Sequence, residues 1–165
     1  MRAYEKLVDQ HQATAFRVAW LITRSSPDAE EAAQDGFLKA YRTLGRFHEG
    51  APFRPWLLRI VANEARNRKV AAQRRERLAL RALEGRAPDD AAPAEVEAIA
   101  SSERAELIAA ISRLDGRDQL VIGARFFLEL TEVEAAAALG IRPGTVKSRL
   151  SRALARLREE MKPNG

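Results

Sequence analysis

The sequence predicts an all-α protein made of two small helical domains that are joined by a flexible linker. Apolar residues recur at helical spacing along most of the chain, and no segment alternates as a β-strand does. One acidic stretch with two prolines interrupts the helical pattern. We place the first domain at residues 1–80, the linker at residues 81–102 and the second domain at residues 103–165, which ends in a helix-turn-helix.

The composition narrows the possible partners and the cellular setting. The 165 residues carry a net charge of +5, which favours nucleic acid or an anionic membrane surface as partner, although a soluble protein can also be basic without such a partner. The absence of cysteine excludes disulfides, thiolate nucleophiles and cysteine-bound metals. No apolar run approaches a membrane span, and residues 1–6 lack the layout of a signal peptide. We therefore expect a cytoplasmic protein without membrane insertion.

The first domain is expected to contain three helices. The first carries an apolar stripe made of Tyr4, Leu7, Val8, Ala15, Val18, Ala19 and Ile22. The second is expected to begin at Pro27, in the first helical position, with the hydroxyl of Ser26 as its cap. Its inward residues are expected to be Ala29, Ala33, Phe37, Ala40, Tyr41 and Leu44. After a loop over residues 45–52, Pro55 opens a third helix, which is expected from residue 56 to about residue 77.

The linker is predicted from a change in composition. Residues 84–106 contain seven acidic and two basic residues, and residues 87–93 hold two prolines without any apolar period. Such a stretch cannot bury enough apolar surface to fold by itself. We expect helices to resume over residues 103–114, 117–128, 131–139 and 143–161.

The last two of these helices have the signature of a helix-turn-helix. Thr131 and Glu134 fit a capping box, Gly140 suits a left-handed helix end, and Pro143 suits the start of the next helix. Ile141 can fill the corner between the helices. The expected apolar face of the first helix is Val133, Ala136, Ala137 and Leu139. That of the second helix is Val146, Leu150, Ala153, Leu154 and Leu157.

The outward side of the last helix is polar and basic. Residues 142–162 include seven basic and two acidic residues. An α-helix fits the major groove of B-DNA, where its N-terminal turns meet the bases. A basic helix taken alone is more often a solvated surface, but here it follows a capped short helix and a glycine turn. We predict that this helix binds duplex DNA through Thr145, Lys147, Ser148, Arg149, Ser151 and Arg152.

A second candidate nucleic-acid surface lies on the third helix. Trp56, Arg59, Asn63, Arg66 and Asn67 share one side of that helix. The preceding loop adds His48 and Phe53. Aromatic and arginine planes stack on unpaired bases and asparagine reads base edges, so this set suits single-stranded DNA better than a duplex. Phe53 and Trp56, each taken alone, fit equally well as core residues.

Three segments resemble bacterial sigma factors of the extracytoplasmic-function (ECF) type, members of the sigma-70 family. They are residues 28–41 (DAEEAAQDGFLKAY), 53–63 (FRPWLLRIVAN) and 139–153 (LGIRPGTVKSRLSRA), and they occur in the order and at the separation of that family. The family supplies the promoter-specificity subunit of RNA polymerase. The resemblance implies promoter DNA and core RNA polymerase as partners, together with an anti-sigma factor, and no cofactor.

The resemblance also implies roles for particular residues. The first domain is expected to bind the clamp helices of the largest polymerase subunit through Glu31, Gln34, Asp35, Phe37 and Leu38. The loop from His48 to Phe53, with the helix behind it, is expected to open the minus-ten element and hold a flipped base. The last helix is expected to read the minus-thirty-five element as duplex. Leu120, Phe126 and Phe127 are expected to meet the flap of the second-largest subunit.

Three positions depart from the family pattern. Asp115 stands where proline is usual, Glu129 where a glycine commonly ends a helix, and Ala135 where a larger aliphatic residue is common. These changes bear on packing and on the flap contact, whereas the recognition helix is intact.

Two other classes of function remain open at this point. A stand-alone regulator with the same helix-turn-helix would leave residues 31–37 as a solvated helix, and substitutions of Asp35 and Phe37 would then not affect polymerase binding. An enzyme is disfavoured, because His11 and His48 are the only histidines and no phosphate-binding loop, metalloprotease motif or nucleophile elbow is present. We predict no metal site and a monomer in the free state.

Overall fold

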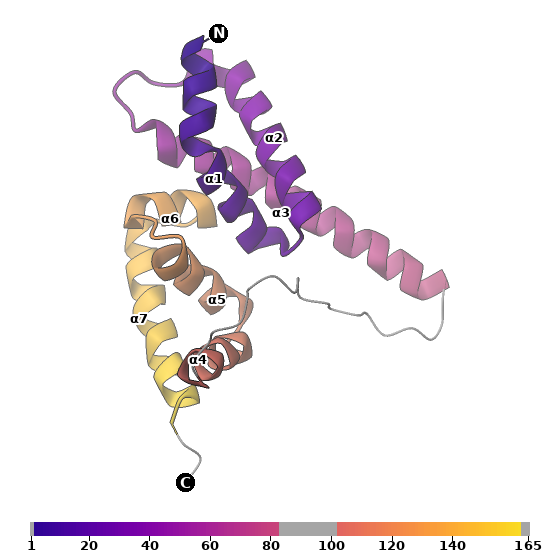
Figure 1. Cartoon of the computed structure of the whole chain (residues 1–165), viewed down its shortest axis with the longest axis vertical. Helices are drawn as coiled ribbons and strands as arrows, with labels where there is room; N and C mark the ends of the chain where they lie inside the picture. Colours follow the sequence, from indigo (N-terminus) through magenta and orange to yellow (C-terminus); the bar gives the residue numbers. More distant parts are fainter. Residues whose placement is uncertain (1, 83–101, 163–165) are drawn as a thin grey trace.

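The computed structural model describes residues 2–82 and 102–162, and that part of the chain is helical with no strand (Figure 1). Its helices are α1 (Arg2–Thr23), α2 (Ser26–Thr43), α3 (Phe53–Ala82), α4 (Ser102–Arg113), α5 (Gly116–Ile122), α6 (Glu132–Leu139) and α7 (Pro143–Glu160). Two short turns add η1 (Leu44–Arg46), a 3-10 helix, and η2 (Gly123–Phe127), a π-helix. The all-α class is confirmed, with α1–α3 as one helical unit and α4–α7 as the other. Residues 83–101 of the predicted linker lie outside the described residues.

Helices α1, α2 and α3 form a three-helix bundle with a tightly packed core. Leu57, Leu58 and Val61 of α3 are fully buried in it. A Cβ atom on Gly36 of α2 would lie 2.6 Å from Cγ2 of Val61 and 3.0 Å from Cα of Val61. Glycine at this position therefore lets α2 approach α3 closely.

Two details of α2 differ from the sequence prediction. Its cap is Ser25 rather than Ser26: the Ser25 hydroxyl accepts a hydrogen bond from the Asp28 backbone N–H at 3.4 Å, and the helix begins one residue earlier than expected. Tyr41 and Leu44 are exposed rather than inward. The Tyr41 ring contacts the Tyr4 ring, with centroids 5.0 Å apart, and both rings line a groove between α1 and α2.

Helix α3 is longer than expected and extends beyond the bundle. It begins at Phe53, three residues before the predicted start, and ends at Ala82, five residues after the predicted end. Its buried residues end at Ala65, and from residue 69 to residue 82 almost every side chain is exposed. The C-terminal half of α3 therefore projects away from the other helices (Figure 1).

The second unit is built around α7, against which α4, α5 and α6 pack. Asp115, in place of the usual proline, caps α5 by accepting the Asp118 backbone N–H at 2.9 Å. Asp118 itself is buried and pairs with Arg156 of α7 at 2.5 Å. The hydrogen bond to Asp118, together with the negative charge of that carboxylate, raises the pKa of Arg156 above its usual value. The pair ties α5 to α7.

The two units are in contact. Helix α6 packs against α3 (Figure 1), and η2 touches the C-terminal end of α1. Buried side chains of both units form one core. None of the helices in residues 2–82 and 102–162 is long and apolar enough to cross a membrane.

Replacing Glu129 by glycine is expected to stabilise the protein by about 0.5–1 kcal/mol. Glu129 has a φ of 52°, a left-handed conformation that strains any residue with a Cβ atom. Glycine relieves this strain, although it also gains freedom in the unfolded chain. Chemical denaturation measures the change, with Glu129→Ala as the control because it removes the carboxylate but keeps the strain. Equal stability of the two variants would contradict this explanation.

Candidate nucleic-acid interface

The helix-turn-helix forms as the sequence predicts. The Thr131 hydroxyl accepts the Glu134 backbone N–H, and the Glu134 carboxylate accepts the Thr131 backbone N–H, each at 3.2 Å. Gly140 has a φ of 67° and ends α6 in the left-handed conformation. The Ile141 backbone N–H reaches back to the Ala136 carbonyl at 3.1 Å, so the turn into α7 is fixed by backbone hydrogen bonds.

The inner and outer sides of α7 separate as expected. Val146, Ala153 and Leu157 are buried, and Leu150 and Leu154 are partly buried against the core. The outer side presents the predicted duplex-binding residues: Lys147, Ser148, Ser151 and Arg152 are exposed, and Thr145 and Arg149 are half-buried. Pro143 lies in the first turn of α7. The positive end of the helix dipole is therefore at the same end of α7 as the first of these side chains.

Hydrogen bonds within α7 hold part of this surface in place. The Ser148 hydroxyl donates to the Thr145 carbonyl at 3.2 Å, and Arg152 Nε donates to the Ser148 carbonyl at 3.4 Å. The Arg152 side chain is therefore held along the helix while most of its donors remain available. Such an arrangement suits contact with base edges and phosphates in a major groove.

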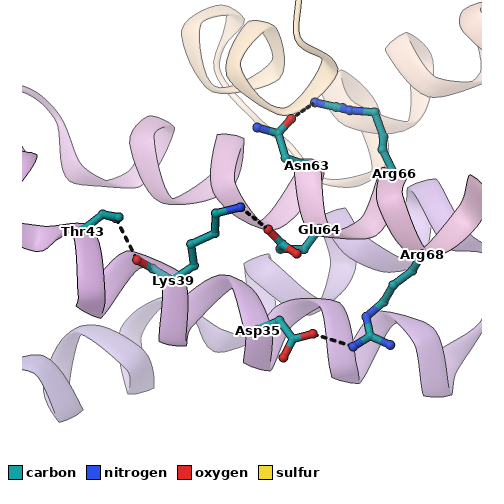
Figure 2. Close-up of polar contacts among 7 residues, drawn as sticks. All are labelled: Asp35, Lys39, Thr43, Asn63, Glu64, Arg66 and Arg68. Atoms are coloured by element: carbon teal, nitrogen blue, oxygen red, sulfur yellow. Dashed lines mark hydrogen bonds and ion pairs between the residues drawn. The ribbon is translucent and has the colours of Figure 1, made fainter. Parts of the chain in front are cut away.

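The predicted single-strand surface is only partly assembled. Arg59, Asn63 and Asn67 are exposed on α3, whereas Arg66 is half-buried. Arg66 donates to the Asn63 carboxamide oxygen at 3.0 Å (Figure 2). His48 is exposed in the loop before α3, where its Nδ1 lies 3.4 Å from the Arg46 carbonyl.

The aromatic residues of this surface form a cluster at the start of α3. The Trp56 ring lies 5.0 Å from that of Phe47 and 5.6 Å from that of Phe53, centroid to centroid. Phe53 also contacts His11, at 5.6 Å between ring centroids. Burial lowers the pKa of His11, and the nearby Arg54 charge lowers it further. The rings of Phe47, Phe53 and Trp56 are half-buried. Phe53 and Trp56 therefore combine the core and surface roles that the sequence left open.

The acidic residues predicted to bind polymerase are both paired with one arginine. Arg68 of α3 donates to Asp35 at 2.5 Å (Figure 2). It also donates to Glu31. These bonds raise the pKa of Arg68, with the Asp35 hydrogen bond as the largest cause. Sequence reasoning missed Arg68, because nothing in the local pattern links residues 33 positions apart.

An apolar groove of about 520 Å³ lies between α1 and α2. It is lined by Tyr4, Glu5, Val8, Gln34, Phe37, Leu38 and Tyr41. Of the predicted contact residues, Gln34 and Leu38 are exposed, whereas Phe37 is 9% exposed and belongs mainly to the core. The Tyr4 hydroxyl donates to the Phe37 carbonyl at 2.5 Å, and this hydrogen bond joins α1 to α2.

The residues predicted to meet the flap lie on α5 and η2. Phe126 and Phe127 are both more than half exposed, whereas Leu120 is half-buried. Val133, expected on the inner side of α6, is 52% exposed, and Ala135 and Ala138 are buried instead. The cause is the packing of α6 against α3 as well as α7, which turns Val133 toward solvent. Val133 thus adds a third exposed apolar side chain to this region of the second unit.

The fold and these surfaces define a helical DNA-binding protein of two units, one with a helix-turn-helix and one with an aromatic and basic helix. Family models match both units: Sigma-70 region 2 matches residues 7–75, and Sigma-70, region 4 matches residues 104–157. The chain therefore belongs to the sigma-70 family, among its ECF RNA polymerase sigma factors, which direct the polymerase to promoters.

Individual relatives agree with this assignment. The ECF RNA polymerase sigma factor SigM of Mycobacterium tuberculosis is 34% identical over 94% of this chain and 75% of SigM. The RNA polymerase sigma factor NccH of Alcaligenes xylosoxydans is 31% identical over 94% of this chain and 84% of NccH. In contrast, this chain spans 40% of the probable sigma factor RfaY of Xanthomonas campestris, with 33% identity.

Solved structures extend the similarity to three dimensions. CnrH, solved in complex with the cytosolic domain of CnrY, has a TM-score of 0.65 and 26% identity, covering 99% of this chain and 90% of CnrH. The sigma factor RpoE of Bartonella quintana, solved with the anti-sigma factor NepR, has a TM-score of 0.67 and shares the fold at 23% identity, with each chain fully covered.

Proposed function

We propose that this sigma factor reads its promoter with two separate surfaces. The first domain, residues 1–80, would open and hold the minus-ten element with the exposed side of α3. The second domain, residues 103–165, would read the minus-thirty-five element with α7, and residues 81–102 would join them. The observation that carries this proposal is the exposed basic N-terminal half of α7, which follows a capped α6 and a left-handed glycine turn.

The polymerase would contact this sigma factor at two apolar surfaces. The groove beside Leu38 suits an incoming helix of the polymerase clamp, because its lining is mostly apolar. Phe126, Phe127 and Val133 suit the flap, because exposed aromatic side chains are enriched where proteins dock. In this proposal the protein works in the cytoplasm as a specificity subunit, without a reaction or cofactor of its own.

An anti-sigma factor is proposed as a further partner. CnrH and the Bartonella RpoE were each solved with a protein bound to them, CnrY and the anti-sigma factor NepR. The same groove and aromatic surfaces that would receive polymerase are the surfaces that an inhibitor would need to cover.

Transcription with bacterial core RNA polymerase from a library of random promoters tests the whole proposal. We expect specific transcripts that share two spaced upstream elements. Retained binding to duplex DNA without polymerase association would instead favour a stand-alone regulator.

Replacing Leu38 by aspartate is expected to weaken binding to core polymerase by roughly tenfold or more, because it places a charge in an apolar contact. Leu38 is a better test than Phe37, since it is 55% exposed and its loss should leave the bundle folded. Fluorescence anisotropy with labelled protein measures the affinity. The matched control is Leu78→Asp, at a residue 64% exposed on the projecting half of α3. Equal affinities of the two variants would exclude this groove as the clamp site.

Replacing Asn63 by alanine is expected to slow open-complex formation by roughly tenfold, because a base-edge hydrogen bond is lost. Duplex binding through α7 should not change, because Asn63 is exposed on α3 in the other unit. Permanganate footprinting of unpaired thymines measures opening, and a mobility shift measures duplex binding. Gln73→Ala, exposed further along α3, serves as the control. Equal losses in both assays would contradict a role in melting.

A further inference from the structure

A cavity of about 470 Å³ lies where the C-terminal end of α1 meets α3 and the start of α5. Sites for small ligands usually have volumes of about 300–1,000 Å³. Only Leu120 of its lining belongs to a surface already proposed for DNA or polymerase, so most of this cavity has no part in the proposed function. Its lining includes Leu21, Arg24, Lys69, Asp115, Arg117 and Leu120.

Three positively charged side chains from different parts of the fold line this cavity. Arg24 follows the last residue of α1, Lys69 lies on α3, and Arg117 lies in the first turn of α5. None of them forms a salt bridge among residues 2–82 and 102–162. In contrast, Arg68, which precedes Lys69, pairs with two carboxylates. Cations that line one cavity attract anions to it, so the cavity suits an anionic ligand.

The backbone of Arg24 is strained. Its φ of 55° is in the left-handed region, where a residue that follows a helix is usually glycine. The Arg24 backbone N–H donates to the Trp20 carbonyl at 2.7 Å, and the Arg24 guanidinium lies 5.0 Å from the centre of the Trp20 ring. These contacts hold both the backbone and the charged group of Arg24 beside the cavity. Strained residues cluster at ligand sites, and a ligand explains an arginine here better than the stability of α1 does.

The second unit presents Arg117 on a firmly held backbone. The Gln119 side-chain amide donates to the Leu114 carbonyl at 2.8 Å, and the Asp115 carboxylate accepts the Asp118 backbone N–H at 2.9 Å. This backbone hydrogen bond is the main reason that the pKa of Asp115 lies below its usual value. Asp115 therefore stays ionised and opposes the three cations of the cavity with a single negative charge.

A ligand of this cavity has to offer negative charge to cations that come from both units. Linked phosphates carry several charges and many acceptor oxygens. Arginine binds phosphate through paired donors, and lysine binds it as a point charge. Leu21 and Leu120 supply an apolar part of the lining, which an uncharged group such as a nucleoside can cover. The chemistry of the lining therefore favours a diphosphate group, either free or attached to a nucleoside.

We propose that this cavity is a binding site for a small ligand with a diphosphate group, which Arg24, Lys69 and Arg117 hold through their positive charges. The site goes beyond the proposed reading of a promoter, since none of these three residues belongs to the surfaces proposed for DNA or polymerase. Binding of such a ligand can therefore be measured without DNA and without polymerase.

Isothermal titration calorimetry of the full chain with inorganic pyrophosphate and with adenosine diphosphate tests the site, at low salt and without divalent metal. We expect saturable one-to-one binding, with orthophosphate roughly tenfold weaker because it carries fewer charges. Tighter binding of adenosine diphosphate would assign a nucleoside diphosphate, and tighter binding of pyrophosphate would assign the free anion. The absence of saturation with both would overturn the proposal.

Removal of single charges shows whether binding occurs in this cavity. Lys69→Gln and Arg117→Gln should each weaken pyrophosphate binding by roughly five- to tenfold. Arg158→Gln is the matched control, because it removes the same charge from an exposed position of α7 outside the cavity. An equal loss in Arg158→Gln would mean that the anion responds only to the overall charge of the protein, and the proposal would fail.

Asp115→Asn should have the opposite effect. Asparagine caps a helix as well as aspartate does, so α5 keeps its start while the cavity loses its negative charge. Pyrophosphate should then bind several-fold more tightly. The control is Asp9→Asn, at an exposed position of α1 outside the cavity. Equal gains in the two variants would contradict a site at Asp115.

Two further measurements separate a ligand site from a structural role and from a DNA surface. Arg24→Gly relieves the left-handed strain, so the melting temperature should not fall, whereas pyrophosphate affinity should fall at least fivefold. Unchanged affinity in this variant would exclude Arg24 from the site. Arg117→Gln should bind non-specific duplex DNA as the unchanged protein does. A loss of duplex binding as large as the loss of pyrophosphate binding would show that these cations serve DNA, and it would overturn the proposal.

Discussion

Replacement of Gly36 by valine is expected to destabilise the α1–α3 bundle by about 2–3 kcal/mol. The first added carbon would lie 2.6 Å from a methyl of Val61 and 3.0 Å from the Val61 Cα atom. The methyl could turn away, but the backbone of α3 cannot move without separating α2 from α3. Valine gains helix propensity relative to glycine, but that gain is well under 1 kcal/mol and does not offset the overlap.

Urea denaturation followed by circular dichroism measures this loss. Gly116→Val is the matched control, because Gly116 is also helical but has no atom within 4 Å of its Cβ position. We also expect weaker polymerase binding by the Gly36 variant, since separation of α2 from α3 would pull Asp35 away from Arg68. Equal stability of the two valine variants would show that the α2–α3 contact can relax at little cost.

Replacement of Arg152 by alanine is expected to weaken binding to the preferred minus-thirty-five duplex by about 1–3 kcal/mol and to relax the preference at one base pair. Arg152 is exposed on the outer side of α7, and among residues 2–82 and 102–162 its guanidinium is engaged only through Nε, with the Ser148 carbonyl. The two terminal nitrogens of its guanidinium remain available for a guanine. Competition binding by the holoenzyme against duplexes with single substitutions measures both effects.

Substitutions of two other arginines of α7 distinguish the loss of a base contact from a loss of charge and from a loss of stability. Arg158→Ala removes the same charge from an exposed position near the C-terminal end and should leave sequence preference intact. Arg156→Ala should mainly lower the melting temperature, because it leaves the buried Asp118 without its partner. A loss at Arg152 that is uniform over all sequences would mean that it contacts only phosphate.

Local signals in the sequence predicted most of the helices and the helix-turn-helix. Thr131 with Glu134, Gly140 and Pro143 act within a few residues of their positions, so their pattern alone fixes where α6 ends and α7 begins. The buried stripe of α1 from Ala15 to Ile22 was likewise predicted from its period. The roles of the predicted DNA-binding and polymerase-binding residues remain predictions.

The errors share a different physical origin, which is contact between residues distant in the chain. Val133 has the period of a core residue, but α6 is covered by both α3 and α7, and this rotates Val133 outward. Tyr41 also has the right period, but its ring packs on that of Tyr4 in the open groove between α1 and α2 and stays exposed. The Arg66–Ala138 bond joins residues 72 positions apart, and no local pattern could indicate it.

The π-helical turn η2 has a consequence for comparing this chain with others. Its widened turn, with the Leu128 backbone N–H bonded to the Gly123 carbonyl at 2.9 Å, accommodates one residue more than an α-helical turn does. Phe126 and Phe127 lie in this turn and project from it into solvent. A homologue whose helix ends in regular α-turns should therefore be one residue shorter between Ile122 and Leu130. In an ungapped comparison the residues of that homologue beyond this turn would then be matched to the wrong positions of this chain, Phe126 and Phe127 included.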